Sequence, residues 1–455
     1  MAEYIAAAPT RRHEASLIGK WAWAFFDWAG QPFFTLVTTF IFAPYFATAF
    51  IGDPVEGQAM WGYGQSLAGF LIALFSPLLG AMADAGGRRK PWLLFFSLFY
   101  VLSASLLWYA LPGAPGLSLG VVLTALIVAT VCAEFTSIFN NAMLPDIVPP
   151  AHIGRWSGIG WGLGYIGGLL SLGLVLMAFV LTETPLLGLD KDSHEPDRFV
   201  GPLSALWYAV FVLPLFFFTP DQSVRIRKIS ATFNEGVRRL IDTLKKARQF
   251  GNAARFLLAR MIYQDGLNAI FAFGGIYAAG TFGWKIETLA IFGIVLSVFA
   301  ALGAFAGGWL DDRLGSKRTI IISLLGLFFG TLLAMSITAD HVLFVIETAP
   351  VQVTGGLFAS PPEKFYLLAG IIIGFSGGPA QAASRTLMAR IAPPAMMAEF
   401  FGLFAFSGKA TAFAAPFLIA LVTASFASQR LGLAVVLVFL VGGLALFLRV
   451  RETAG

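Results

Sequence analysis

A short motif occurs twice in this chain, and each copy follows a very apolar stretch. Both copies read Gly-x-x-x-Asp-x-x-Gly followed by basic residues, with a constant offset between their anchors. They comprise Gly80, Asp84, Gly87, Arg88 and Arg89, and then Gly308, Asp312, Gly315, Lys317 and Arg318. The first glycine permits close backbone approach, while the carboxylate, the turn and the cations suit a membrane surface. A motif repeated between hydrophobic segments predicts a duplicated membrane bundle.

The composition also indicates a bilayer environment. Hydrophobic residues make up 58% of the chain and charged residues only 12%, which is too apolar for an ordinary soluble domain. The single Cys132 excludes an internal disulfide framework, and the four histidines lack metal-ligand spacing, so we expect no metal and no cofactor. The net charge of +5 comes from basic residues in short loops between apolar segments, which argues against nucleic-acid binding.

Segments of about 20 mostly apolar residues are long enough to cross a bilayer as helices. On this criterion the sequence predicts an all-α polytopic membrane protein with twelve transmembrane helices. The first six span residues 21–50, 61–83, 92–110, 118–141, 156–181 and 200–219. The second six span residues 256–279, 288–310, 319–337, 365–389, 400–424 and 431–448.

The predicted organisation is a six-helix half with a cytosolic tail in residues 1–219, a linker in 220–255 and a second six-helix half in 256–455. The linker is basic, and Val237, Leu240, Ile241 and Leu244 keep helical spacing, which predicts an amphipathic helix on the inner membrane surface. A plain linker helix is favoured there over a regulatory target. Nearly all Lys and Arg share one side with both termini, so we expect that side to be the cytosolic side of a bacterial inner membrane. We also expect the protein to be a monomer.

Internal similarity extends beyond the motif. Pro149-Pro150 matches Pro393-Pro394, and Gly164 matches Gly408, at the same offset. Asp27 in the first span likewise has a counterpart, Asp265, in the seventh. Two six-helix halves related by a pseudo-twofold axis along the membrane normal account for these repeats most simply.

The loop motifs, the twelve spans and the basic linker resemble the major facilitator superfamily. Four stretches resemble its vacuolar-effluxer-like branch, which is related to autophagy-associated amino-acid effluxers: residues 26–29, 139–147, 161–168 and 271–277. The resemblance implies the major facilitator fold and solute transport by alternating access, with amino acids as one candidate substrate. In that setting we interpret the two motif loops as conformational switches.

Ionisable residues inside the spans are the first candidates for function, because each costs at least about 2.5–3.5 kcal/mol unless it meets water or a partner. Lys409 lies about ten residues, roughly 15 Å, into its span. It is either an anion-binding or coupling cation, or one member of a structural ion pair. Asp27 and Asp265 are either proton-coupling carboxylates or paired structural groups near a gate, and their symmetry favours the structural role.

Glu134 has no acidic counterpart in the second half, where Arg385 occupies a similar depth. We favour a functional role for both over a direct salt bridge that closes a gate. Neutral side chains are candidates for hydrogen bonds to a polar solute, although several of them are expected to join helices instead: Gln31, Asn140, Asn141, Gln264, Asn268 and Gln381. The charged residues Lys409, Glu134, Arg385, Asp27 and Asp265 are predicted to converge on one water-accessible cavity.

The glycine-rich stretch at 158–168 lies inside an apolar span with no preceding strand, so it predicts close helix packing rather than a nucleotide site. The leading hypothesis is a secondary or facilitative transporter of a small polar solute, with the lipid bilayer and the solute as partners and protons as a candidate coupling ion. The alternatives are an exporter of amphipathic or hydrophobic compounds and a membrane receptor that does not transport. No catalytic motif is present, so an enzyme is not expected.

Overall fold

The computed structural model describes residues 15–452 except for 87, 113–115, 150–152, 222–249, 350, 352–355, 392–399, 401–402 and 405. Some side chains within helices also lie outside the description. The motif residues Gly80, Asp84, Gly87 and Asp312 therefore fall outside the described residues and side chains, as does the predicted linker helix.

Long helices dominate the first part of the chain. The first span is built from α1 (Leu17–Pro32), η1 (Phe33–Phe40), α2 (Phe42–Tyr45) and η2 (Phe46–Phe50). It is followed by α3 (Pro54–Gly86), α4 (Lys90–Leu106) with η3 (Leu107–Tyr109), α5 (Leu119–Ile147), α6 (Ile153–Val175) with η5 (Leu176–Val180), η6 (Leu186–Gly188) and α7 (Glu195–Phe218). The first span is not one regular helix, because two π-helical stretches flank a break at Ile41, where φ is −122° and ψ is −67°.

The second part repeats this arrangement with α9 (Gly251–Phe282), α10 (Ile286–Leu314), α11 (Ser316–Met335), α12 (Pro361–Ile391), α14 (Ala414–Phe426) and α15 (Gln429–Phe447). Its β-structure is one short hairpin in which β1 (His341–Val342) pairs antiparallel with β2 (Ile346–Glu347). Every predicted span contains described helix. Within the described residues, nine helical segments are long and apolar enough to cross a membrane, and α14 is a shorter apolar helix.

Several helix ends follow directly from local sequence. The Ser16 hydroxyl accepts a hydrogen bond from the Gly19 N–H at the start of α1, and Ser428 caps α15 in the same way. Gly315 ends α10 with φ of +84°, a conformation that residues with a side chain rarely adopt. The turn expected from the second copy of the motif therefore forms at its glycine.

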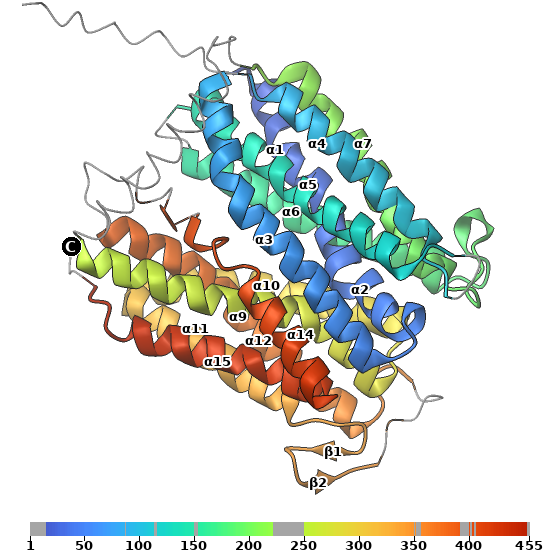
Figure 1. The fold of residues 1–455 in the computed structure, drawn as a ribbon. Coiled ribbons are helices and arrows are strands. Elements are labelled where there is room, and N and C mark those ends of the chain that lie inside the picture. The colour runs from blue at the N-terminus through green and yellow to red at the C-terminus, as the bar shows by residue number, and fades with distance from the viewer. Residues whose placement is uncertain are drawn as a thin grey trace, which may run out of the picture.

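The helices before residue 220 gather into one group and those after residue 250 into another (Figure 1). The first group is held by contacts of α1 with α6 and α7 and of α4 with α5, and the second by α9 with α15 and by α12 with α10 and α11. The groups meet most closely between α3 and α14, where a Cβ on Gly62 would lie 2.8 Å from Ala420 and one on Gly69 would lie 2.9 Å from Phe413. In Figure 1 they diverge toward the side marked C.

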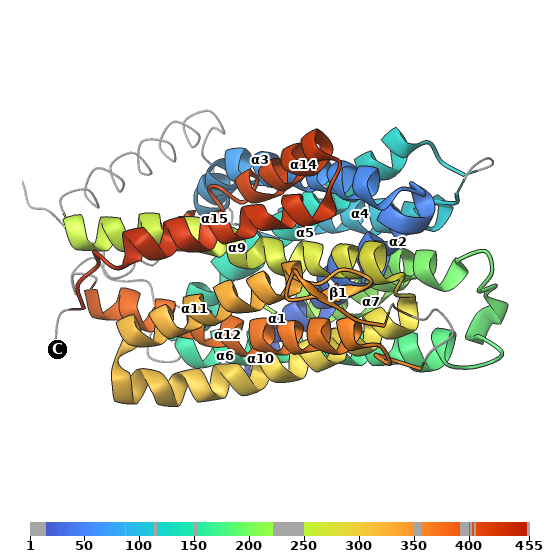
Figure 2. The same ribbon diagram turned by 90° about the horizontal axis from the view of Figure 1, so that it is seen from below.

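The bundle has two distinct ends, which are also visible from below in Figure 2. We call one the basic end, because it carries Arg88, Arg89, Lys90, Lys317, Arg318, Arg390, Arg449 and Arg451. We call the other the opposite end; it carries the described connections at residues 51–53, 110–112, 116–118, 181–194, 283–285, 338–349 and 356–360.

The glycines of α6 bring this helix directly against α1. A Cβ on Gly160 would lie 2.6 Å from an Asp27 carboxylate oxygen, and one on Gly167 would lie 2.8 Å from the Trp28 carbonyl oxygen. A Cβ on Gly168 would lie 2.6 Å from the Thr35 hydroxyl. These approaches confirm that the glycine-rich stretch serves packing.

Candidate functional site

An ion pair joins the two groups of helices. The Lys409 ammonium donates a hydrogen bond to the Glu134 carboxylate of α5, and the two residues are 275 positions apart in sequence. The side chains are 41% and 26% exposed, so the pair is neither fully buried nor free in solvent. Lys409 therefore has a carboxylate partner on another helix, while its exposure leaves the ammonium accessible to a solute.

The chain around Lys409 is not regular α-helix. Residues 408–413 form turns between the helical residues 403–404 and 406–407 and α14. The N–H groups of Lys409 and Ala410 both donate to the Phe406 carbonyl, and the Ala412 N–H donates to the Lys409 carbonyl. Interrupted membrane helices of this kind expose backbone polar groups that can take part in ligand binding.

Two arginines lie near this pair. Arg260 of α9 donates to the Phe404 carbonyl (2.7 Å) and the Ser407 hydroxyl (2.9 Å), and its guanidinium lies 3.6 Å from the centre of the Phe404 ring. Arg385 of α12 is exposed and close enough to Arg260 and Tyr165 to interact with them electrostatically. No described ion pair joins Arg385 to Glu134.

The sequence reasoning missed Arg260. The signal was available, because Arg260 stands four residues inside the predicted seventh span, where the cost of an intramembrane charge already applies. With Arg260, the region holds three cations, while Glu134 supplies the one carboxylate in a described ion pair with any of them.

The two symmetric aspartates have different surroundings. Asp27 is half-buried on α1, against the α6 backbone at Gly160. Asp265 on α9 is only 2% exposed, and its carboxylate faces the Thr411 hydroxyl. The two aspartates therefore occupy matching positions in the sequence but differ in their exposure to solvent.

The candidate amides also occupy varied positions. The Gln264 amide donates to the Asn268 side-chain oxygen (2.9 Å) along α9. Asn140 is 1% exposed, and its backbone carbonyl accepts a hydrogen bond from the Trp23 indole (2.8 Å). Gln31 is half-buried beside Gly168, whereas Asn141 and Gln381 are exposed. One cavity shared by all five predicted charged residues stays a prediction; the described ion pairs join two of them.

At the basic end, each group of helices has a carboxylate that accepts hydrogen bonds from backbone N–H groups at the N-terminus of a helix. The backbone N–H groups of Arg89 and Lys90 donate to Asp221 (2.9 and 3.2 Å), which follows α7, and the Arg89 guanidinium pairs with Asp146 of α5. The arrangement suits a helix N-terminus, which favours negative charge. Arg88 and Arg318 are exposed.

The second group repeats the arrangement at α11. The N–H groups of Ser316 and Lys317 donate to Glu452 (3.0 Å each), and Arg390 of α12 pairs with the same carboxylate (2.6 Å). Burial acts to raise the pKa of Glu452, but the hydrogen bonds from the backbone and Arg390 outweigh it and lower that pKa below its usual value of 4.5. Sequence reasoning missed Asp221 and Glu452, although both follow the last span of their half.

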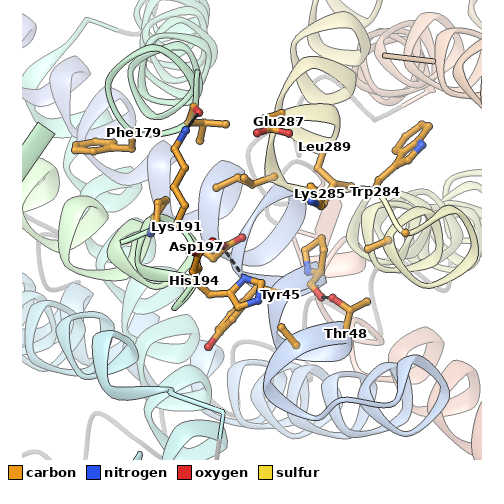
Figure 3. A pocket seen from close by; sticks show the side chains of 18 residues that line it. Tyr45, Thr48, Phe179, Lys191, His194, Asp197, Trp284, Lys285, Glu287 and Leu289 are labelled. Atoms are coloured by element: carbon orange, nitrogen blue, oxygen red, sulfur yellow. Dashed lines mark hydrogen bonds and ion pairs between the residues drawn. The ribbon is translucent and has the colours of Figure 1, made fainter. Parts of the chain in front are cut away.

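A cavity of about 690 Å³ opens at the opposite end (Figure 3). It lies between η2, the loop before α7, the end of α9 and the start of α10. His194 and Asp197 form a 3.3 Å ion pair there, and Tyr45 lies beside His194 with the ring centres 5.5 Å apart. The hydrogen bond from His194 to Asp197 raises the pKa of His194 above 6.5, although burial opposes the shift. Lys285 and Glu287 line the cavity from the start of α10.

Comparison with a family profile and with individual proteins shows what this sequence is similar to. A sequence profile described as "Vacuole effluxer Atg22 like" matches residues 47–155 and 152–455. The "Uncharacterized MFS-type transporter YxiO" of Bacillus subtilis (strain 168) is 26% identical over 438 residues, which cover 95% of each chain. An "Autophagy-related protein 22" of Cryptococcus neoformans var. neoformans serotype D is 24% identical over 310 residues. That match covers 66% of this chain and 51% of the fungal protein, so the chain aligns with about half of that relative.

Solved structures share the fold. A D-xylose-proton symporter superposes with a TM-score of 0.66 at 12% identity, covering 96% of this chain and 97% of that one. The nucleoside transporter NupG gives 0.60 at 14% identity, covering 95% and 97%. Together with the helical architecture, these matches show that the chain is an integral membrane protein with the major facilitator fold, and that it belongs to the family of vacuole effluxer Atg22-like transporters.

Proposed function

We propose that the protein carries a small zwitterionic solute, such as an amino acid, across the bilayer by alternating access. The observation that carries the proposal is the Lys409–Glu134 ion pair, which joins the two groups of helices and remains partly exposed. An ammonium and a carboxylate held side by side match the two charges of a zwitterion. A solute can therefore replace the internal pair with two equivalent pairs.

The nearby cations favour a solute that carries a carboxylate. Arg260 and Arg385 add positive charge beside Lys409. Arg260 is held by Phe404 and Ser407, whereas Arg385 is exposed and has the planar donor geometry that suits a carboxylate. We assign Arg385 and Lys409 to the solute carboxylate, and Glu134 to its amino group.

Alternating access would move the half formed by residues 1–219 against the half formed by residues 256–455. The close packing of α3 on α14 supports a state in which the two groups are held together at this contact near the opposite end. We propose that the basic end faces the cytosol of a bacterium, because Lys and Arg collect on the cytosolic side of membrane proteins. The carboxylate-capped turns at α4 and α11 would act as conformational switches.

The test is counterflow in proteoliposomes loaded with an unlabelled amino-acid mixture and diluted into a labelled mixture. The wild type is expected to accumulate label transiently, and Lys409→Ala should lose at least about nine-tenths of this activity, since a lost ionic contact of about 1.4 kcal/mol already costs tenfold. Gln65→Leu on α3 serves as a variant outside the proposed site.

The amount of folded protein separates a binding role from a structural one. If Lys409→Ala is recovered folded but inactive, the solute role is supported. If it is recovered only when Glu134→Gln is also present, and the double variant transports normally, the pair is structural and the proposal fails. Counterflow of amphipathic compounds but not of amino acids would instead establish the export alternative, and specific binding without counterflow of any solute would establish a receptor.

A further inference from the structure

The connection between α11 and α12 carries an apolar turn at the opposite end of the bundle. In the hairpin of β1 and β2, Val342 pairs with Ile346, so Leu343, Phe344 and Val345 form the loop between the strands. All three loop residues and Ile346 are exposed, and Val345 is 79% exposed. Hairpin loops in contact with water are usually built from Gly, Asn and Asp. A run of four exposed apolar residues is therefore the opposite of what water favours at this turn.

The backbone of the loop is also unfavourable for the residues it contains. Leu343 and Phe344 have φ of +51° and +69°, in the left-handed region that large side chains rarely adopt. Asn or Gly would occupy these two positions at little cost. The chain therefore places bulky apolar side chains where local backbone preference favours small or polar ones, which indicates that the side chains contact something outside the loop.

The base of the hairpin is firmly held. Val342 is only 2% exposed and packs in the apolar core. The Thr348 N–H donates to the Asp340 carbonyl (2.8 Å), and the Thr338 N–H donates to the His341 carbonyl (2.9 Å). The Thr338 hydroxyl also donates to the Asp340 carboxylate (2.9 Å). These contacts fix the direction in which the strands run, so the exposure of the tip is a property of the folded protein.

The tip folds back to the level of the helix ends. The Phe344 N–H donates to the carbonyl of Ser336, the residue that directly follows α11 (2.9 Å). Arg430, in the first turn of α15, has its guanidinium 4.7 Å from the centre of the Phe344 ring. Figure 1 shows the hairpin at the outer edge of the second group of helices, on the side away from the first group. The tip therefore lies at the side of the bundle, level with the ends of α11 and α15.

The two helices that adjoin the tip have apolar exposed surfaces. Phe329 of α11 is 58% exposed, and Leu431 and Val438 of α15 are exposed as well. Both helices are long and apolar enough to cross a membrane, so these side chains face hydrocarbon. The exposed apolar surface is therefore continuous in kind from the membrane helices to the hairpin tip beside their ends.

We infer that the hairpin tip inserts into the bilayer, at the boundary between headgroups and acyl chains of the leaflet at the opposite end. The ionisable side chains of the hairpin gather at its base, where His341 lies 2.8 Å from Asp340 and 3.9 Å from Glu347. An apolar tip and a charged base suit an element that lies in this boundary, where apolar faces enter roughly 5–10 Å. Arg430 keeps its charge among the headgroups while it covers Phe344. Lipid contact at this hairpin does not depend on what the protein transports.

The experiment measures which reagents reach a spin label on the tip. Val345→Cys and, as the matched control, Glu347→Cys are made in the Cys132→Ala background, labelled, and placed in lipid nanodiscs with one molecule in each disc. Power saturation then compares collisions of each label with O₂, which concentrates among acyl chains, and with a water-soluble nickel chelate. The Val345 label should collide mainly with O₂. The Glu347 label, on a side chain that is 88% exposed at the base of the same hairpin, should collide mainly with the chelate.

Two results would overturn the lipid contact. A Val345 label that collides mainly with the nickel chelate would place the tip in water. A Val345 label that neither reagent reaches would mean that protein covers the tip, and the assignment to lipid would fail equally. If Val345→Cys does not fold, Leu343→Cys at the other end of the loop replaces it, with the same expected result and the same two contrary results.

Discussion

Replacing Gln58 with leucine should loosen the opposite end of the bundle. Gln58 of α3 is completely buried, and its amide donates to the Thr423 hydroxyl (2.8 Å) and the Gln429 carbonyl (3.2 Å) of the second group. Gln429 in turn donates to the Pro54 carbonyl (2.8 Å). These polar contacts cross between the two groups of helices and must break if that end opens.

The expected size of the effect follows from the two bonds that Gln58 donates. Each buried hydrogen bond contributes about 0.5–1.5 kcal/mol net. Losing both should therefore reduce the ratio of closed to open molecules by about 1–3 kcal/mol, roughly 5- to 150-fold. Leucine keeps similar bulk, so packing between α3 and α14 is largely preserved.

Distances between spin labels measure this ratio. Labels at the exposed positions Glu56 and Ser425, in a Cys132→Ala background, lie on the two sides of the contact. The Gln58→Leu variant should shift the distance distribution toward longer values, whereas Gln65→Leu, two turns along the same helix with an unbonded amide nitrogen, should not. Equal distance distributions in the two variants would show that the Gln58 hydrogen bonds do not hold this end closed.

Three further outcomes can be measured by thermal unfolding in detergent. Asp146→Asn should destabilise the protein by about 2 kcal/mol because it removes the ion pair between Asp146 and Arg89, and a much smaller loss in an Arg89→Gln background would verify the pairing. Because the pKa of His194 is raised, its pair with Asp197 stabilises the folded protein fully below about pH 6.5 and less as the pH rises through the pKa of the folded state. His194→Gln should remove this loss of stability at alkaline pH. A variant with the wild-type pH profile of unfolding would contradict the prediction. Because the pKa of Glu452 is lowered, its contacts stabilise the folded protein above about pH 4.5 and lose this effect as the pH falls. The wild type should therefore unfold at a higher temperature than Glu452→Gln above about pH 4.5 but not in acid. A difference in stability that persists in acid would count against the assigned contacts.

Much of the architecture was predictable because membrane helices are specified by local composition. Each predicted span contains described helix, the turn at Gly315 forms where the motif requires a glycine, and the glycines of α6 pack against α1. Hydropathy, a glycine with positive φ and small residues at helical spacing are properties of short stretches of chain. They need no knowledge of what lies on neighbouring helices.

The candidate site was predictable only as a list of residues. The cost of an intramembrane charge predicts partners for Lys409, Glu134 and Asp265, and it holds equally for Arg260, which stands nearer the end of its span. Nothing in the sequence says that Lys409 meets Glu134 rather than Asp265.

Partner choice depends on how each helix is rotated and tilted within the bundle, and packing across the whole molecule sets those angles. Local sequence therefore specifies which segments enter the membrane and which charges need partners. Helix packing in three dimensions places Lys409 against Glu134 across 275 positions, lets Gln58 join the two groups at the opposite end, and leaves Asp265 less exposed than Asp27.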